Sequence, residues 1–241
     1  MKNKIIATLG PSSFSKEVIQ KLDRSGVDLF RINLSHTKIS DYAKNVEQFS
    51  QWTKKPICPD TEGAQLRTSI IKNDTINVNT HDYINLVSDK DYKDYKNEVP
   101  LNINNTDQLL SPGDILKIDF DSVIVQIIEV KKGSVISKVL CGGIIGSNKG
   151  IGTSRSLSLP CFSNKDLRIF EISKNLNQKI VFLSFCSSSD DVQMLRDIYG
   201  YQIEIIAKIE STLGIKNLRQ ICQTVDGILV DRGDLSRDVA I

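Results

Sequence analysis

Two short apolar runs of the sequence end in charged residues that could bind a metal and an anion. Lys208 and Glu210 stand at alternate positions near the end of the first run, and Gly233 and Asp234 follow the second. Alternate residues of a strand point to the same side, so Lys208 and Glu210 are expected to share a face. Carboxylates are ligands for Mg²⁺ or Mn²⁺, and an ammonium stabilises a phosphate or a developing oxyanion. The pattern predicts a metal-assisted site for an anionic ligand.

Two further apolar runs end in the same way. Arg31, Asn33 and Ser35 alternate along one of them, and the other ends at Asp60 and Thr61. Each charged residue taken alone could form an ordinary ion pair within a sheet. Four clusters at strand ends favour a shared site instead, because polar side chains at the carboxyl ends of parallel strands converge at one face. An arginine there would bind phosphate.

These clusters need a parallel sheet to bring them together, and the apolar pattern predicts one. Near-continuous apolar runs are typical of strands buried on both faces of such a sheet. Helical patterns that open at Ser15, Ser163 and Ser188 alternate with them, which indicates βαβ units. We expect strands at six runs: 4–9, 29–34, 56–60, 180–185, 203–209 and 227–230.

Residues 69–157 interrupt this alternation. Helical periodicity disappears there, short β-like stretches are separated by turns, and the runs 123–130 and 135–140 predict a hairpin. We expect an all-β domain inserted into an α/β framework that comprises residues 1–68 and 158–241. The framework is too short for a complete (β/α)₈ barrel of roughly 250 residues and allows about six βα units.

Composition excludes several other classes of protein. The 31 lysine and arginine residues nearly balance the 29 aspartate and glutamate residues, and a net charge of +2 does not favour a nucleic-acid binder. No run of about 18 apolar residues could span a membrane, and no secretory signal opens the chain. The 5 cysteines are scattered without a CxxC pair, so we expect reduced thiols and a cytoplasmic protein.

The ordered set of motifs resembles the pyruvate kinase family over nearly the whole chain. The similarity is carried by KIIATLGPSS at 4–13, FRINLSH at 30–36, DTEG at 60–63, LRT at 66–68, GSNKG at 146–150, AKIE at 207–210 and RGDL at 232–235.

The resemblance implies a (β/α)₈ barrel with a β-rich cap domain inserted after the third strand. Since the chain ends at Ile241, after the sixth strand-like run, we expect a partial TIM-type barrel that lacks the family's last two units and its C-terminal domain. The remaining sheet is then either open and curved, or completed by association with a second copy or another chain.

The resemblance also implies the reaction, in which phosphoenolpyruvate and ADP give pyruvate and ATP in glycolysis. Arg31 would contact the transferring phosphoryl group, and Lys208 would stabilise the transition state and the emerging enolate. Glu210 and Asp234 would bind Mg²⁺ or Mn²⁺, and Gly233 and Asp234 would touch the substrate. Closure of the cap would exclude water and so suppress hydrolysis.

Two further sets of residues are implied in the same way. A site for K⁺ would take its ligands from Asn33, Ser35, Asp60 and Thr61. The nucleotide would be contacted by Asn33, His36, Arg67 and Lys149.

The chain departs from the family at several of these motifs. The usual Lys-Gly-Pro-Glu is replaced by residues 62–65, where Gln65 takes the place of a glutamate associated with potassium dependence. Asp231 replaces the usual alanine and Ser236 the usual glycine. The extra carboxylate of Asp231 would repel an anionic substrate or alter metal occupancy unless it points away.

Two other functions compete with the kinase. One is a catalytically impaired relative that binds the ligands or a protein partner without turnover, suggested by Asp231, Gln65 and the missing units. The other is a metal-dependent lyase that would use Lys208, Glu210 and Asp234. Retention of the cap and of the nucleotide-side residues argues against the lyase.

Overall fold

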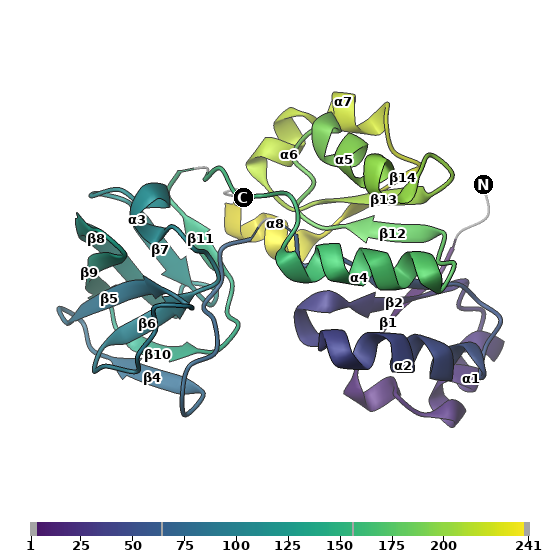
Figure 1. Ribbon diagram of the computed structural model, residues 1–241, viewed down its shortest axis with the longest axis horizontal. Coiled ribbons are helices and arrows are strands. Elements are labelled where there is room, and N and C mark those ends of the chain that lie inside the picture. Colours follow the sequence, from purple (N-terminus) through teal and green to yellow (C-terminus); the bar gives the residue numbers. More distant parts are fainter. Residues whose placement is uncertain (1–3, 64, 156, 239–241) are drawn as a thin grey trace. The chain divides into compact units, whose positions relative to one another are not determined.

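The chain forms two compact units, shown in a computed structural model that describes residues 4–63, 65–155 and 157–238 (Figure 1). The first unit combines the residues before 65 with those from 160 to 238, and the second comprises residues 65–159. The inserted domain was predicted at residues 69–157, and its role as a cap remains a prediction.

The first unit is built on a curled sheet in which all neighbouring strands are parallel. Its strands, in spatial order, are β1 (Ile6–Leu9), β2 (Leu29–Asn33), β3 (Ile57–Asp60), β12 (Ile180–Leu183), β13 (Glu204–Ile209) and β14 (Gly227–Val230). β1 and β14 stand at the two ends of this order. The architecture confirms the predicted α/β class and the partial barrel.

Helices connect these strands and cover one face of the sheet (Figure 1). They are α1 (Lys16–Arg24), α2 (Ile39–Ser50), α4 (Asn164–Asn175), α5 (Ser189–Tyr199), α6 (Thr212–Lys216) and α7 (Leu218–Cys222), whereas α8 (Arg232–Asp238) follows the last strand. The predicted caps are confirmed: the side chains of Ser15, Ser163 and Ser188 each accept a hydrogen bond from a first-turn backbone N–H. Such bonds satisfy donors that a helix cannot pair internally.

The two faces of the sheet are packed differently. The face under the helices carries two large apolar clusters, around Phe30 and Tyr42 on one side and around Phe170 and Leu183 on the other. The opposite face carries one small cluster, made of Leu29, Cys58 and Phe182 with Ile180, Ile206 and Leu229 packed against it. Because side chains alternate along a strand, the residues two positions further on point to this same small face.

The second unit is a β structure with only the short helix α3 (Thr106–Leu109) among its described residues. The order of its larger sheet is β11 (Ile151–Thr153), β7 (Ile115–Ile118), β8 (Val123–Lys131), β9 (Ser134–Cys141), β5 (Tyr83–Ser88) and β6 (Glu98–Leu101). A smaller sheet pairs β4 (Thr75–Val78) with β10 (Gly143–Gly146). β8 and β9 form the predicted hairpin.

The loop that follows β3 is fixed by a carboxylate at the start of α4. Asp166 Oδ1 accepts the backbone N–H of Glu62 at 2.8 Å, and its Oδ2 accepts that of Gly63 at 3.2 Å. Gly63 has a φ of +71°, and a Cβ there would lie 2.6 Å from the carbonyl oxygen of Ser184. Only glycine fits this close approach of two loops at the carboxyl end of the sheet.

The lengths and compositions of the helices bear on whether any of them could cross a membrane. None of those in the described part of the chain combines the length and the apolar character that crossing a bilayer requires.

The close approach at Gly63 predicts a large loss of stability in Gly63→Ala. We expect the free energy of unfolding to fall by about 3 kcal/mol or more, because strain at positive φ adds to a clash with backbone. Gly26→Ala is the matched control: its φ is +92°, but a Cβ there would meet nothing within 4 Å, so we expect a loss of only about 1 kcal/mol. Urea denaturation measures both, and equal losses would contradict the steric argument.

Candidate active site

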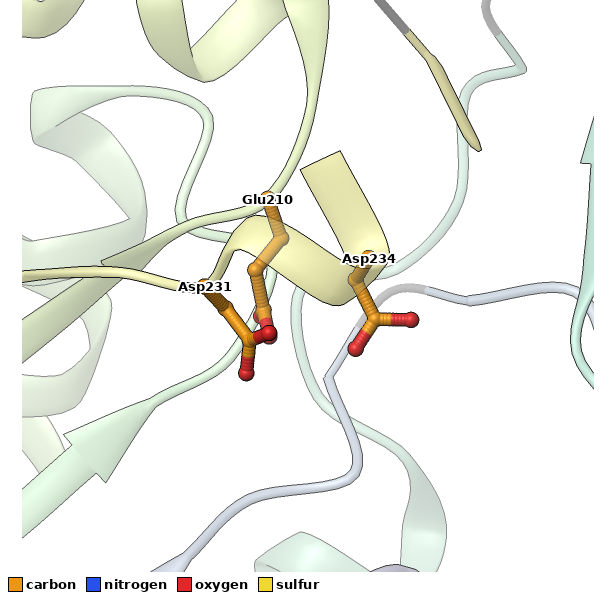
Figure 2. A group of neighbouring side chains, drawn as sticks. All are labelled: Glu210, Asp231 and Asp234. Carbon is orange, nitrogen blue, oxygen red and sulfur yellow. The ribbon is translucent and has the colours of Figure 1, made fainter. Parts of the chain in front are cut away.

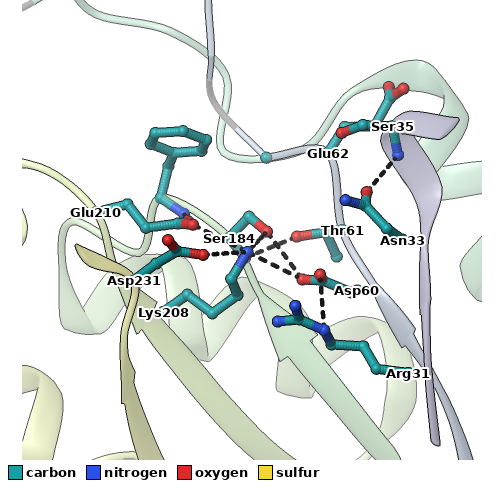
Figure 3. A network of polar contacts seen from close by, with 12 residues as sticks. Arg31, Asn33, Ser35, Asp60, Thr61, Glu62, Ser184, Lys208, Glu210 and Asp231 are labelled. Atoms are coloured by element: carbon teal, nitrogen blue, oxygen red, sulfur yellow. Dashed lines mark hydrogen bonds and ion pairs between the residues drawn. The ribbon is translucent and has the colours of Figure 1, made fainter. Parts of the chain in front are cut away.

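The polar ends of four neighbouring strands meet around the ammonium of Lys208 on β13 (Figure 3). Lys208 Nζ lies 2.9 Å from Glu210 Oε1 and 3.3 Å from Asp60 Oδ1. Asp60 Oδ2 lies in turn 3.3 Å from Arg31 Nε. The structure therefore brings together these four sequence-predicted residues, from the ends of β2, β3 and β13.

The cluster is shielded from water. The side chains of Lys208, Asp60 and Glu210 are 7%, 1% and 0% exposed. Charges buried to this degree are costly unless they are paired and hydrogen-bonded, and here each of them has a partner of opposite sign.

Two residues at the end of β12 complete the hydrogen bonding. Lys208 Nζ donates to Ser184 Oγ at 3.2 Å, and this hydroxyl donates to Asp60 Oδ1 at 3.1 Å. The backbone N–H of Phe185 donates to Glu210 Oε2 at 2.7 Å. Ser184 was not among the predicted site residues, although its position two residues after Phe182 places it on the same face as Lys208.

Burial and pairing shift the protonation of the cluster. Burial raises the pKa of Glu210 to about 7, although Lys208 and the N–H of Phe185 act against it. Burial also raises the pKa of Asp60, against the attraction of Lys208 and Arg31. Burial alone would lower the pKa of Lys208, but Asp60 and Glu210 outweigh it and hold this pKa above its usual value. Lys208 is therefore a cation at neutral pH.

A second group of carboxylates adjoins the lysine. One oxygen each of Glu210, Asp231 and Asp234 lies within 4.8 Å of the others (Figure 2). Asp231 follows β14 and Asp234 belongs to the first turn of α8. Carboxylate oxygens at this spacing suit a hard divalent cation such as Mg²⁺ or Mn²⁺, so the residues present fit the metal that the sequence predicts.

Asp231 points into this group rather than away from it. Its Oδ2 lies 3.8 Å from Lys208 Nζ, and its Oδ1 accepts the backbone N–H of Gly233 at 3.2 Å. Asp231 was predicted as a departure from the family and not as a site residue. Its place two residues after Leu229, which packs on the small face of the sheet, is the signal that would have included it.

Arg31 keeps one donor nitrogen for a further partner. Its Nε donates to Thr8 Oγ1 at 3.0 Å, and its guanidinium lies 5.6 Å from the ring centre of Phe182. Its Nη1 is buried and has no hydrogen-bond partner among the described residues. A buried guanidinium nitrogen without a partner suits an anionic oxygen.

Two of the residues predicted for K⁺, Asn33 and Ser35, do not lie on one continuous strand. β2 ends at Asn33, and Ser35 lies in the short 3₁₀ helix η2 (Leu34–His36), because Asn33 Oδ1 accepts the backbone N–H of Ser35 at 2.9 Å. Thr61 Oγ1 accepts the N–H of Ser184 at 2.8 Å. His36 ends the same 3₁₀ helix and is exposed.

Two of the residues predicted for the nucleotide lie side by side in the second unit. Arg67 forms a bridge to Gly150, and its Nη1 donates to the carbonyl oxygen of Asn148 at 3.3 Å. Lys149 Nζ lies 3.0 Å from Asp119 Oδ2, a partner that the sequence analysis missed. The assignment of these residues to a nucleotide remains a prediction.

Comparison with known proteins identifies the family. A sequence model described as "Pyruvate kinase, barrel domain" matches residues 1–241. The chain is 30% identical over 249 residues to a pyruvate kinase of Thermococcus litoralis, 28% over 244 residues to one of Agrobacterium vitis, and 29% over 253 residues to pyruvate kinase 1 of Saccharomyces cerevisiae.

These alignments cover 100%, 99% and 99% of the chain but 52%, 51% and 50% of the relatives, respectively. The chain thus spans about half the length of the curated relatives that it matches. Because the family model covers every residue, and the curled parallel sheet is the one expected of part of that barrel, the chain belongs to the pyruvate kinase family.

Proposed function

We propose that the protein transfers a phosphoryl group from phosphoenolpyruvate to ADP and so forms pyruvate and ATP in glycolysis. The observation that supports this most strongly is the buried ammonium of Lys208, held between Asp60 and Glu210 in a chain of this family. The reactants carry several negative charges, so their transfer chemistry depends mainly on positioning and on neutralising charge.

Arg31 would bind the transferred phosphoryl group, and Lys208 would lie at the oxygen atom from which this group departs. The buried Nη1 of Arg31 has no partner among the described residues and would donate to the phosphoryl oxygens. Lys208 would stabilise the transition state and the oxygen of the enolate as the phosphoryl group departs. Because Ser184 and the two carboxylates fix its ammonium, Lys208 needs little reorganisation to do so.

Glu210 and Asp234 would hold Mg²⁺ or Mn²⁺, with Gly233 and Asp234 also touching the substrate. When bound, a divalent cation would neutralise part of the charge that develops on the phosphoryl and enolate oxygens. The spacing of the carboxylate oxygens, within 4.8 Å of one another, supports this assignment.

The nucleotide phosphates would be bound by Arg67 and Lys149, with Asn33 and His36 as further contacts. Lys149 is ion-paired with Asp119 in the structure, so a phosphate would compete with that carboxylate for its ammonium. We assign K⁺ to the oxygens of four residues: Asn33, Ser35, Asp60 and Thr61.

The family and the exposed end of the sheet also suggest a location and a form of association for the protein. As a member of a glycolytic family, the protein is assigned to the cytoplasm. Val230 on the end strand β14 is 58% exposed, and Ile228 is 36% exposed. Association with a second copy or with a completing chain would cover this edge.

The proposed role of Lys208 predicts that Lys208→Met abolishes turnover. We expect formation of ATP from phosphoenolpyruvate and ADP, measured in a coupled assay with Mg²⁺, to fall by about 10³-fold or more. Lys216→Met is the control, since Lys216 is exposed on α6, and it should keep the rate of the unsubstituted chain. Unchanged turnover in Lys208→Met would contradict the role of this lysine.

The unsubstituted chain itself is the test of the function. If it forms no ATP at high protein concentration yet still binds phosphoenolpyruvate and ADP, the catalytically impaired relative is the correct interpretation. Retained turnover would exclude it.

The proposed K⁺ site predicts that Gln65→Glu increases the response to potassium. Gln65 Oε1 is buried and has no hydrogen-bond partner among the described residues. The family resemblance associates a glutamate at this position with potassium dependence, so we expect the ratio of rates with K⁺ and with tetramethylammonium to rise several-fold. An unchanged ratio at equal ionic strength would contradict this association.

A further inference from the structure

Asp231 is fixed by the backbone that surrounds it, in an orientation that faces the carboxylates of Glu210 and Asp234 (Figure 2). Its Oδ1 accepts the N–H of Gly233 at 3.2 Å, and its carbonyl oxygen accepts the N–H of Leu235 at 3.0 Å. The side chain is 28% exposed. These contacts direct its second oxygen, Oδ2, toward the cluster without burying the group completely.

Lys208 does not satisfy this second oxygen. An ammonium has three donors, and Ser184, Glu210 and Asp60 lie within 3.3 Å of Lys208 Nζ. Asp231 Oδ2 lies 3.8 Å away, which is beyond hydrogen-bond distance. Asp231 is attracted by the lysine but is not its hydrogen-bond partner.

A second, separate observation concerns Glu210. Its side chain is 0% exposed, its Oε2 accepts the N–H of Phe185, and its Oε1 lies 2.9 Å from Lys208 Nζ, an ammonium that also serves Asp60 at 3.3 Å and Asp231 at 3.8 Å. One ammonium shared among three carboxylates leaves negative charge uncompensated, which is costly in a largely buried site. A second cation bound between Glu210, Asp231 and Asp234 would remove that cost.

The net charge of the cluster also favours a bound cation. The described side chains that these contacts join comprise two cations and four carboxylates: Arg31, Lys208, Asp60, Glu210, Asp231 and Asp234. With all four carboxylates ionised, their formal sum is −2, which one divalent cation neutralises. Without Asp231 the sum would be −1.

We propose that Asp231 is a third carboxylate ligand of the divalent cation, beside Glu210 and Asp234, and that it raises the affinity of the protein for Mg²⁺ and Mn²⁺. This deepens the proposed function and rests on it for the presence of a metal at this position. The extra carboxylate makes the centre bind the cation before the anionic substrate arrives, because affinity for hard cations rises with the number of charged ligands.

The test is a titration with Mn²⁺ alone, in which electron paramagnetic resonance counts free ions in the absence of phosphoenolpyruvate and ADP. In Asp231→Asn, which keeps the size of the side chain and an oxygen for the N–H of Gly233, we expect Kd to rise by about tenfold or more. Asp231→Ala should give at least the same loss. Asp190→Asn, an exposed carboxylate on α5, is the matched control and should leave Kd unchanged.

Thermal unfolding with and without Mn²⁺ provides a second measurement. Binding to the folded state alone raises Tm, so the rise with Mn²⁺ should be smaller in Asp231→Asn than in the unsubstituted chain, while Tm without metal shows that the variant folds. Equal Kd and an equal rise of Tm in the two proteins would overturn the proposal, as would a chain that binds no Mn²⁺ at this centre. A chain that binds Mn²⁺ through Asp231 but forms no ATP would uphold it and overturn the proposed function.

Discussion

The buried ammonium of Lys208 is the interaction on which the rest of the candidate site depends. A cation that is 7% exposed needs counter-charges and acceptors close by, and those come from separate strands: Asp60 ends β3, Ser184 follows β12 and Glu210 follows β13. The sheet order β3-β12-β13 places these strand ends side by side. The parallel sheet thus buries its apolar residues. It also brings together, at the carboxyl ends of its strands, the polar side chains of Asp60, Ser184, Lys208 and Glu210, which we call the polar layer.

Asp166 and Gly63 hold the loops at the carboxyl end of the sheet in place and so support the polar layer. Asp166 caps α4 and also binds the backbone after β3, which fixes the direction in which Asp60 and Thr61 enter the site. Gly63 lets that backbone pass close to Ser184. The polar layer is therefore supported by contacts from the start of α4 as well as by its own ion pairs.

Much of this could be predicted from the sequence, because the alternation of Lys208 with Glu210 and the apolar runs are local signals. Pairings across the sheet are not local: nothing near Ser184 in the chain indicates that its hydroxyl lies between Lys208 and Asp60. Ser35 was expected on a strand, but the side chain of Asn33 ends that strand by capping a turn, and a hydrogen bond of this kind competes with the regular pattern. The alternation after Leu229 places Asp231 on the face of Lys208, but the 3.8 Å between its Oδ2 and Lys208 Nζ depends on how the turn after β14 is folded.

The central claim is that this polar layer carries a deficit of positive charge that one divalent cation fills. The most direct measurement is a crystal structure of the chain with Mn²⁺ and phosphoenolpyruvate, with the ion located by its anomalous scattering. The account predicts one manganese ion in contact with Glu210, Asp231 and Asp234, with Lys208 still beside Asp60 and with Arg31 at the phosphate group. Crystals that contain phosphoenolpyruvate at this site but no manganese between the three carboxylates would contradict it.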